Sequence, residues 1–347
     1  MVLLEGTLKT YDWGSKSAIA ELRGVTPSGR PEAELWFQAE EKLPWLVKIL
    51  AIQKPLSVQL HPNAEQAVRG FEAEESKGIR LDDPKRSYRD KKAKSELVCA
   101  VTPFKAFCGL REINEAIEAA SQFNLPEEIY APLLSNRSES WKEVIERILS
   151  GNWNQCILDL EKRCSEKIGN SWDTTAEEIL KICEFHRDDE SILLLPFMNY
   201  YELNAGDALH VKPGMVHVYL EGMAVEVMEY GDNVIRAGLT KKHVDKSEFL
   251  SLLDAQAKLP PVQTPSGKDY LYSGPTEKLT VRRIENATVE ISDSTGTDLI
   301  LSTDGLTTVK FDEEVNLRQG EALLIDEENE SYTVNTSGVL FLVREEA

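Results

Sequence analysis

The hydrophobic positions of the chain follow a strand-like alternation at both ends and a helical spacing in the middle. Residues 1–110 mix turns with short apolar runs such as 43–52, and residues 111–188 repeat apolar side chains every three or four positions. From about residue 190 the alternation returns, and residues 268–347 read as strands throughout. This order predicts a mainly β chain with an α-helical insert.

The insert shows its helical pattern in two runs of apolar side chains: Ile113, Ala116, Ile117 and Ala120, then Trp141, Val144, Ile145, Ile148 and Leu149. Further on, Thr174 and Glu177 have the spacing of a capping box, which predicts a helix that begins just after Thr174. Because this block offers little obvious chemistry, we assign it a packing role.

A short internal sequence repeat (the internal echo) occurs in both of the strand-rich regions that flank a connector at residues 254–267. Leu203-x-x-Gly206-Asp-Ala-Leu is repeated 114 positions later as Leu317-x-x-Gly320-Glu-Ala-Leu. At the same offset His217 corresponds to Ser331, so the second copy lacks that polar group. We therefore expect a discontinuous domain at 1–110 and 189–253 that carries the polar site, a helical domain at 111–188, and a C-terminal β domain without that site at 254–347.

The charge balance narrows the class of partner. The chain carries 39 basic and 59 acidic side chains, a net charge of −20. Nucleic acids and anionic membranes both require a basic surface, so neither is expected as a partner. The apolar runs are too short to span a bilayer, and the five cysteines lack CxxC spacing. We expect a cytoplasmic protein, in which an anionic substrate would need a local group of cations.

Two strand-like segments carry the candidate chemistry. Ser57, Gln59 and His61 alternate with apolar residues and so share one face of a strand. After the Pro213-Gly214 turn, His217 and Tyr219 share a face in the same way. Each segment also has a plainer interpretation, an exposed edge strand or an ordinary half-buried histidine. The chain has only five histidines, and two of them lie on such strands. This coincidence nonetheless favours a two-histidine metal site.

Other charged residues extend this hypothesis. A catalytic divalent metal commonly adds a carboxylate, and Glu96, which precedes a strand-like run, is the candidate, although it could equally be a solvated glutamate. Lys48 lies inside an apolar strand, where a lysine is costly to bury without a partner. If Lys48 gathered with Lys94, Arg236 and Lys242, the four would form the expected anion site.

Five segments of the chain resemble type I mannose-6-phosphate isomerases over about residues 8–250. They are Tyr11-Asp-Trp13-Gly14, Ala33-Glu34-Leu35-Trp36, Lys54-Pro-Leu-Ser-Val-Gln-Leu-His-Pro-Asn63, Lys94-Ser-Glu96-Leu-Val98, and His217-Val-Tyr219 through Asp232-Asn-Val-Ile-Arg-Ala-Gly-Leu-Thr240. The resemblance implies two cupin-type β-barrels (jelly rolls) plus a helical domain. The C-terminal region resembles the second barrel only in its strand-like alternation of apolar and polar residues.

The resemblance also implies a role for each candidate residue. Zinc, one ion per chain, would be held by Gln59, His61, Glu96 and His217. The catalytic residues would be Arg236, Lys94, Asp232 and Glu226, and the substrate-binding residues Ser57, Lys48, Tyr219, Lys242 and Trp13. One departure is Ala93, where many bacterial members have a histidine. It leaves the ligands intact and leaves the identity of the proton-transferring base open.

The expected reaction interconverts mannose 6-phosphate and fructose 6-phosphate through an enediol. Asp232 or Glu226 ranks first as base and a desolvated lysine second. Two alternatives remain, a non-catalytic sugar-phosphate-binding cupin and an iron-dependent cupin dioxygenase. The expected partner is a small phosphorylated sugar, and the sequence leaves monomer and homodimer open.

Overall fold

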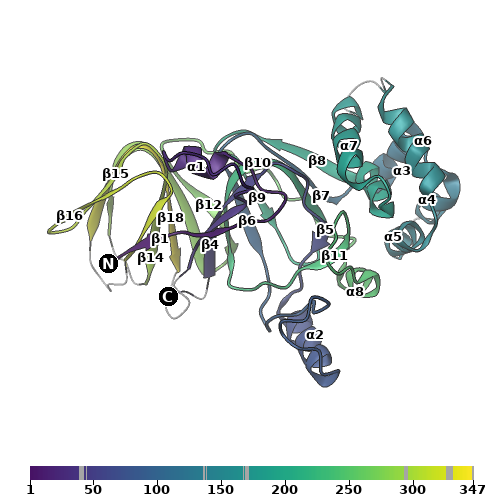
Figure 1. Ribbon diagram of the computed structural model, residues 1–347, viewed down its shortest axis with the longest axis horizontal. Coiled ribbons are helices and arrows are strands. Elements are labelled where there is room, and N and C mark those ends of the chain that lie inside the picture. Colours follow the sequence, from purple (N-terminus) through teal and green to yellow (C-terminus); the bar gives the residue numbers. More distant parts are fainter. Residues whose placement is uncertain are drawn as a thin grey trace.

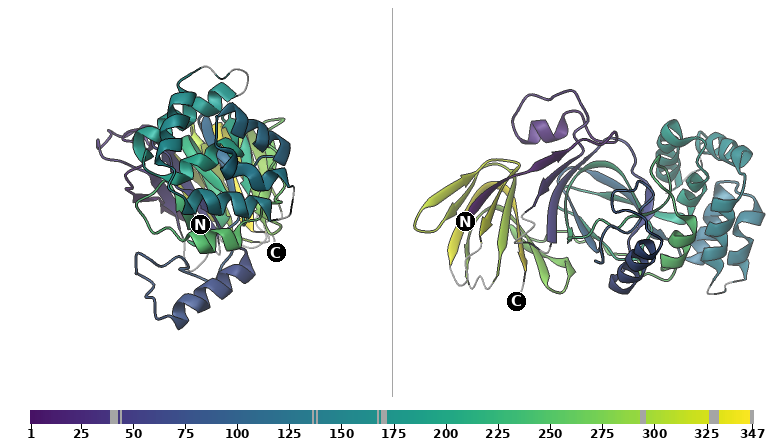
Figure 2. Two further views of the ribbon diagram at one scale, coloured as in Figure 1. Left: turned by 90° about the vertical axis from the view of Figure 1, so that its right-hand side faces the viewer. Right: turned by 60° about the horizontal axis from the view of Figure 1, so that its bottom comes forward.

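The computed structural model describes residues 1–38, 43, 45–135, 137, 139–166, 168, 172–292, 296–325 and 331–345. An eight-stranded sheet occupies one end, a ten-stranded sheet the middle and a group of helices the other end (Figure 1). Helix α2 (Ala64–Ser76) projects from the middle part (Figures 1 and 2). The expected mainly β architecture with helices is confirmed.

The ten-stranded sheet comprises β2 (Thr7–Lys9), β3 (Glu34–Phe37), β4 (Trp45–Ile52), β5 (Val58–Leu60), β6 (Glu96–Ala100), β7 (Phe104–Leu110), β8 (Met198–Leu203), β9 (Ala208–Val211), β10 (His217–Glu229) and β11 (Ile235–Gly238). The eight-stranded sheet comprises β1 (Val2–Glu5), β12 (Asp269–Thr276), β13 (Leu279–Ile291), β14 (Asp298–Asp304), β15 (Thr307–Lys310), β16 (Glu314–Leu317), β17 (Glu321–Ile325) and β18 (Tyr332–Glu345). Pairing among these strands follows open, branched paths and closes no ring, which corrects the expectation of closed barrels.

Strand β10 joins two layers of the ten-stranded sheet. Its first part pairs with β5 and β7, and its second part, from Gly222 on, pairs with β4 and β6. The change occurs at a bulge beside Gly222, whose φ is +118°. A Cβ there would lie 2.4 Å from the carbonyl oxygen of Pro103, so only glycine fits this bend.

Side-chain alternation sorts the second layer into two faces. Val47, Leu97 and Val225 pack toward the eight-stranded sheet, in a core shared with Val281 and Phe341. The alternate positions belong to a second core, with members from both layers: Leu50, Val98, Phe104, Tyr219 and Ala224. Because the period of a strand is two, Lys48, Glu96 and Glu226 share the parity of this second face. The candidate polar residues therefore lie between the two layers.

Besides α2, the described helices are α1 (Ala18–Leu22), α3 (Ile113–Gln122), α4 (Glu127–Leu134), α5 (Ser140–Ser150), α6 (Asn154–Cys164), α7 (Trp172–His186) and α8 (Lys246–Leu252), with a 3₁₀ helix, η1 (Glu190–Phe197). The apolar runs predicted to be helical lie in α3 and α5, and the α5 run from Trp141 to Leu149 is buried. The predicted start after Thr174 is wrong: α7 already includes Trp172, so Thr174 lies inside the helix. Ser/Thr-x-x-Glu spacing also occurs within helices, where it caps nothing.

The internal echo corresponds to two similar turns. Leu203 ends β8 and Leu317 ends β16, and each is followed by a glycine in the left-handed region, Gly206 (φ +94°) and Gly320 (φ +76°). The strands that follow, β9 and β17, are antiparallel partners of β6 and β14. Ser331, which corresponds to His217, is exposed.

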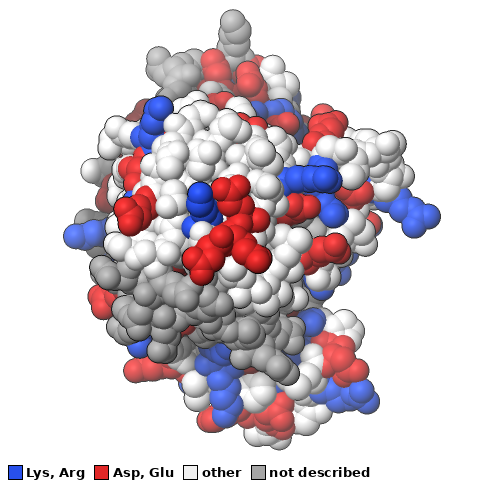
Figure 3. Space-filling view, turned by 90° about the vertical axis from the view of Figure 1, so that its left-hand side faces the viewer, with Lys and Arg blue, Asp and Glu red and all other residues white. Residues whose placement is uncertain are grey.

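The surface gives no sign of a broad basic patch on the face that Figure 3 shows. Among the described residues of that face, Lys and Arg appear singly or in small groups between Asp and Glu and wide uncharged areas. No helix in the described ranges is long and apolar enough to cross a membrane.

Candidate active site and metal centre

Three side chains that could bind a metal meet between the two layers. His61 follows β5, Glu96 begins β6 and His217 begins β10, and one potential ligand atom from each lies within 4.8 Å of the others. Backbone hydrogen bonds hold these segments together: Lys94 N donates to Pro62 O (3.2 Å) and Gly214 N to His61 O (2.8 Å). All three side chains are fully buried.

The hydrogen bonds of the two histidines fix their tautomers. His61 Nδ1 lies 2.8 Å from the carbonyl oxygen of Asn233, and His217 Nδ1 lies 3.0 Å from that of Met215. A carbonyl oxygen only accepts, so each Nδ1 carries the proton and each Nε2 presents a lone pair. Such backbone bonds orient histidines that bind metals through the other nitrogen.

Both lone pairs face the carboxylate of Glu96. Nε2 of His61 lies 3.2 Å from Oε1, and Nε2 of His217 lies 3.8 Å from Oε2. Nε2 of His61 is buried and has no hydrogen-bond donor among the described residues. Buried lone pairs that converge in this way repel one another unless a cation lies between them.

The protonation of these groups suits a cation. Burial, followed by the Lys94 ammonium, lowers the pKa of His61, and burial, followed by His61, lowers the pKa of His217 to about 4. Burial alone would raise the pKa of Glu96, but Lys94 and His61 outweigh it and hold that pKa well below its ordinary value. At neutral pH the site thus presents two neutral imidazoles and one carboxylate.

Gln59 completes the group. It pairs with His217 across β5 and β10, and its Nε2 lies 3.2 Å from His217 Nε2. Ser57 Oγ donates to Gln59 Oε1 at 2.8 Å. A half-turn of the amide would bring its carbonyl oxygen toward His217 instead, and both orientations fit the same side-chain shape. Two imidazole nitrogens and a carboxylate are ligands that zinc binds, and the amide oxygen would add a fourth. One coordination position would be left for water or another ligand.

Lys94 and Tyr219 contact the remaining surface of Glu96. Lys94 Nζ lies 2.6 Å from Oε1, and Tyr219 donates to Oε2 at 3.1 Å. Burial raises the pKa of Tyr219 well above its usual value, with Glu96 as the next cause, so the phenol stays a donor.

A second buried ion pair lies beside the metal-binding group. Lys48 and Glu226 are direct cross-strand partners in β4 and β10, with Nζ 3.2 Å from Oε2. Lys48 Nζ also lies 4.7 Å from the centre of the Trp36 ring. Burial, with Glu96 next, raises the pKa of Glu226 to about 7. This glutamate therefore changes protonation near neutral pH.

The remaining predicted residues gather around Tyr11, apart from the side chains that could bind a metal. Tyr11 stacks with Trp13 (ring centres 5.7 Å apart), and Lys242 Nζ lies 4.8 Å from the Tyr11 ring centre. Arg236 is the β11 partner of Gln59 and so connects the two groups. The Asp232 side chain is 57% exposed.

Three further residues of this region, Arg89, Asn233 and Tyr11, were not among the candidate site residues. Arg89 Nε lies 4.0 Å from Asp232 Oδ2, and Asn233 supplies the carbonyl that orients His61. Arg89 belongs to a charged run that reads as solvated surface, so no local signal distinguishes it. Asn233 and Tyr11 fall in the motifs that carry the resemblance, and that position was their only signal.

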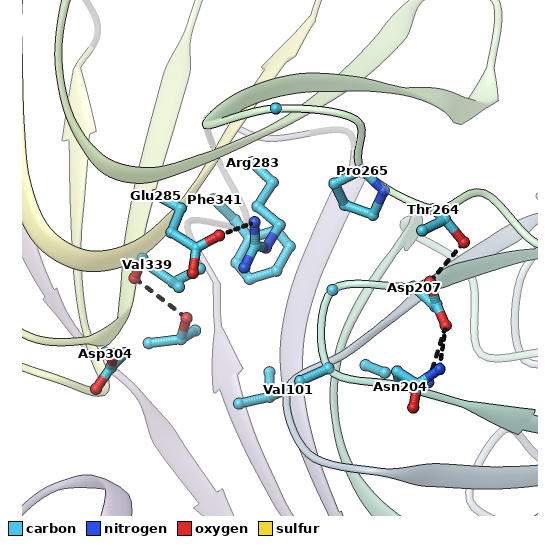
Figure 4. A pocket seen from close by; sticks show the side chains of 15 residues that line it. Val101, Asn204, Asp207, Thr264, Pro265, Arg283, Glu285, Asp304, Val339 and Phe341 are labelled. Atoms are coloured by element: carbon cyan, nitrogen blue, oxygen red, sulfur yellow. Dashed lines mark hydrogen bonds and ion pairs between the residues drawn. The ribbon is translucent and has the colours of Figure 1, made fainter.

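A separate cavity of about 470 Å³ lies between the two sheets and contains none of these residues. Arg283 points toward it, but Arg283 Nη1 donates to Glu285 at 2.8 Å, and Asp207 accepts from Thr264 and Asn204 (Figure 4). These charged groups are thus already engaged by neighbouring side chains and backbone.

Comparisons with known proteins point to one family. A family model described as "Phosphomannose isomerase type I, catalytic domain" matches residues 38–113. The mannose-6-phosphate isomerases of Shigella flexneri and Escherichia coli are each 28% identical, with 98% of both chains covered. Mannose-6-phosphate isomerase 2 of Arabidopsis thaliana is 32% identical over 63% of this chain and 52% of its own.

Solved structures of mannose 6-phosphate isomerases superpose on nearly the whole of this chain. A zinc-bound (holo) mannose 6-phosphate isomerase superposes with a TM-score of 0.88 at 25% identity, covering 99% of both chains. The Salmonella typhimurium enzyme bound to its substrate and zinc gives the same score, identity and coverage. The sequence matches, the full-length fold match and the histidine–glutamate cluster agree: along its whole length the chain is similar to type I mannose-6-phosphate isomerases.

Proposed function

We propose that this chain interconverts mannose 6-phosphate and fructose 6-phosphate and uses one zinc ion. The observation that carries the proposal is the convergence of His61, Glu96 and His217 within 4.8 Å, with both imidazole lone pairs turned inward. Relatives that match over the full length are mannose-6-phosphate isomerases, and a structural neighbour holds both zinc and its substrate.

His61, Glu96, His217 and the amide oxygen of Gln59 would hold the zinc. When bound, the ion supplies Lewis-acid polarisation of sugar oxygens and charge stabilisation. Lys94 and Tyr219, which both contact Glu96, would fix the carboxylate and border the open side of the site. Ser57 would hold the Gln59 amide.

The anionic end of the substrate would bind near Arg236 and Lys242. Loss of solvent, with the neighbouring Arg236 charge as the next cause, lowers the pKa of Lys242, so these cations lie close enough to repel. In a chain of net charge −20, cations held near each other favour an anion between them. Trp13, stacked on Tyr11, would form an apolar wall of this end.

Glu226 or Asp232 would move the proton between C1 and C2. The base removes the C2 proton to give an enediol, and the proton returns at C1. Glu226 is favoured because its pKa of about 7 suits a base at neutral pH, and Lys48 would steady its carboxylate. Arg236, the β11 partner of Gln59, would lie between the metal-binding group and the anion-binding end and would stabilise negative charge on the enediolate.

The proposal extends to the domain architecture, the cellular location and the oligomeric state. We infer that both sheets are cupin-type units with the domain limits 1–110 with 189–253, 111–188 and 254–347, although their strands pair in open paths. Among the described residues, the His/Cys/Asp/Glu cluster lies in the first unit. A cytoplasmic location and a monomeric or dimeric state stay predictions.

A coupled assay with mannose 6-phosphate on metal-analysed protein tests the function. We expect turnover with zinc, loss with a chelator and recovery on adding zinc back. Substrate binding without turnover by zinc-loaded protein would instead support the non-catalytic sugar-phosphate-binding alternative. Activity that depends on iron and oxygen would support the dioxygenase.

A further inference from the structure

Asn233 links the metal-binding group to a neighbouring loop. Its side chain is fully buried in the connection between β10 and β11. Oδ1 accepts from the backbone N–H groups of Arg89 (2.8 Å) and Asp90 (3.2 Å). Nδ2 donates to Asp90 O, Asp90 Oδ1 and Lys92 O, each at 3.0 Å. The amide therefore holds the segment 89–92 through every donor and acceptor it has.

Asp90 returns the contact. Its Oδ2 accepts from the backbone N–H of Asp232 at 2.8 Å, and its Oδ1 accepts from the backbone N–H of Lys92 at 2.8 Å. We call the two side chains the Asn233–Asp90 clamp. The backbone carbonyl of the same asparagine orients His61. The clamp thus connects the loop before Lys94 with the turn that carries Asp232.

The side chain that the clamp presents is Arg89. It is 49% exposed, and its guanidinium makes no hydrogen bond with any residue the structure describes. Its nearest counter-charge is Asp232, with Nε 4.0 Å from Oδ2, too long for a hydrogen bond. Arg236 and Lys242 are further cations of the same neighbourhood, since the Arg89 charge contributes to lowering the pKa of both, after burial.

We propose that Arg89 binds the anionic group of the substrate together with Arg236 and Lys242, and that the Asn233–Asp90 clamp is its positioning element. The proposal rests on the sugar-phosphate isomerase function. A guanidinium with free donors in a fixed fork suits a phosphate, which accepts two parallel hydrogen bonds. Among the described residues, no acceptor lies within hydrogen-bond distance of those donors, and Asp232 at 4.0 Å is the recorded counter-charge.

The first test measures Arg89 itself. Arg89→Gln should raise the KM for mannose 6-phosphate about tenfold and leave kcat within about twofold, since a charged hydrogen bond to bound substrate is lost. The Kd for inorganic phosphate, measured by calorimetry on zinc-loaded protein, should rise by a similar factor. Arg80→Gln is the matched control, because Arg80 is 80% exposed and pairs with Asp82. An unchanged phosphate Kd in Arg89→Gln would overturn the proposal.

The second test measures the clamp. Asn233→Asp replaces the donating amide with a carboxylate that repels Asp90, so the phosphate Kd should rise about as much as in Arg89→Gln. The double variant should be no worse than either single variant, because Arg89 is already displaced. Effects that multiply would show that Arg89 does not depend on the clamp. If Asn233→Asp does not fold, Asp90→Asn gives the same comparison.

The phosphate measurements separate this proposal from the function it rests on. A wild-type protein without turnover, whose phosphate binding still falls in Arg89→Gln, would refute the isomerase and retain the Arg89 site. Normal turnover of the wild-type protein, with unchanged KM and phosphate Kd in Arg89→Gln, would retain the isomerase and refute the Arg89 site. Zinc content, measured in each variant, distinguishes displacement of Arg89 from a shift of His61.

Discussion

Nε2 of His61 lies 3.2 Å from Oε1 of Glu96, with its lone pair turned toward the carboxylate because its Nδ1 donates to Asn233. Nε2 of His217 approaches the other carboxylate oxygen at 3.8 Å in the same protonation state. An arrangement of inward-facing electron pairs is costly when empty and favourable around a cation.

Zinc should therefore stabilise the folded protein. Adding zinc to chelator-treated protein should raise the thermal midpoint, because an ion that binds only the native state shifts the equilibrium toward it. His217→Ala should remove most of the bound zinc and most of this shift, as measured by metal analysis and calorimetry. His243→Ala, which alters a histidine outside the His61–Glu96–His217 cluster, serves as the control. Equal zinc content in the two variants would contradict the ligand assignment.

Glu226 should produce the acidic limb of the pH profile. A base must be deprotonated, so kcat/KM should fall as the pH drops through the pKa of this carboxyl. Burial, with Glu96 as the next cause, raises that pKa to about 7, so the limb should lie above the ordinary range of a glutamate. Glu226→Gln should lower kcat roughly 10²–10⁴-fold and remove this limb. If Asp232→Asn does so instead, Asp232 is the base.

Lys48 and Glu226 should stabilise each other. Lys48→Met leaves a buried carboxylate without its partner, which should lower the free energy of unfolding by about 3–5 kcal/mol at pH 8. The double variant Lys48→Met/Glu226→Gln should recover much of that loss, because no uncompensated charge remains. Urea denaturation of the two single variants and the double variant measures the coupling. Additive losses would mean that the pair does not interact energetically.

Arg236 should act on chemistry and not on metal binding. Arg236→Ala should remove nearly all activity and leave zinc content unchanged, because its guanidinium donates to the carbonyl of Val234 and makes no hydrogen bond to a ligand side chain among the described residues. Lost zinc in Arg236→Ala would assign it a structural role at the metal. Lys241→Ala, an exposed neighbour of Lys242, should keep normal kinetics.

The sequence by itself determined which residues share a face. Strand alternation placed Ser57, Gln59 and His61 together, and His217 with Tyr219, because the two-residue period of a strand is local. The helical insert followed from spacing for the same reason, whereas the start of α7 was misjudged, since a capping-box spacing carries no information about where hydrogen bonding begins. The resemblance supplied Glu96, Arg236 and the reaction.

Only the tertiary structure decided how these faces meet. The bend of β10 at Gly222 brings the layer of Gln59 and His217 over the layer of Glu96 and Glu226, a contact across more than a hundred residues that no local pattern encodes. The backbone carbonyls that fix both imidazoles, the Lys48–Glu226 pair and the exposed guanidinium of Arg89 likewise depend on non-local packing. Protonation states depend on burial and neighbours, and both exist only in the folded chain.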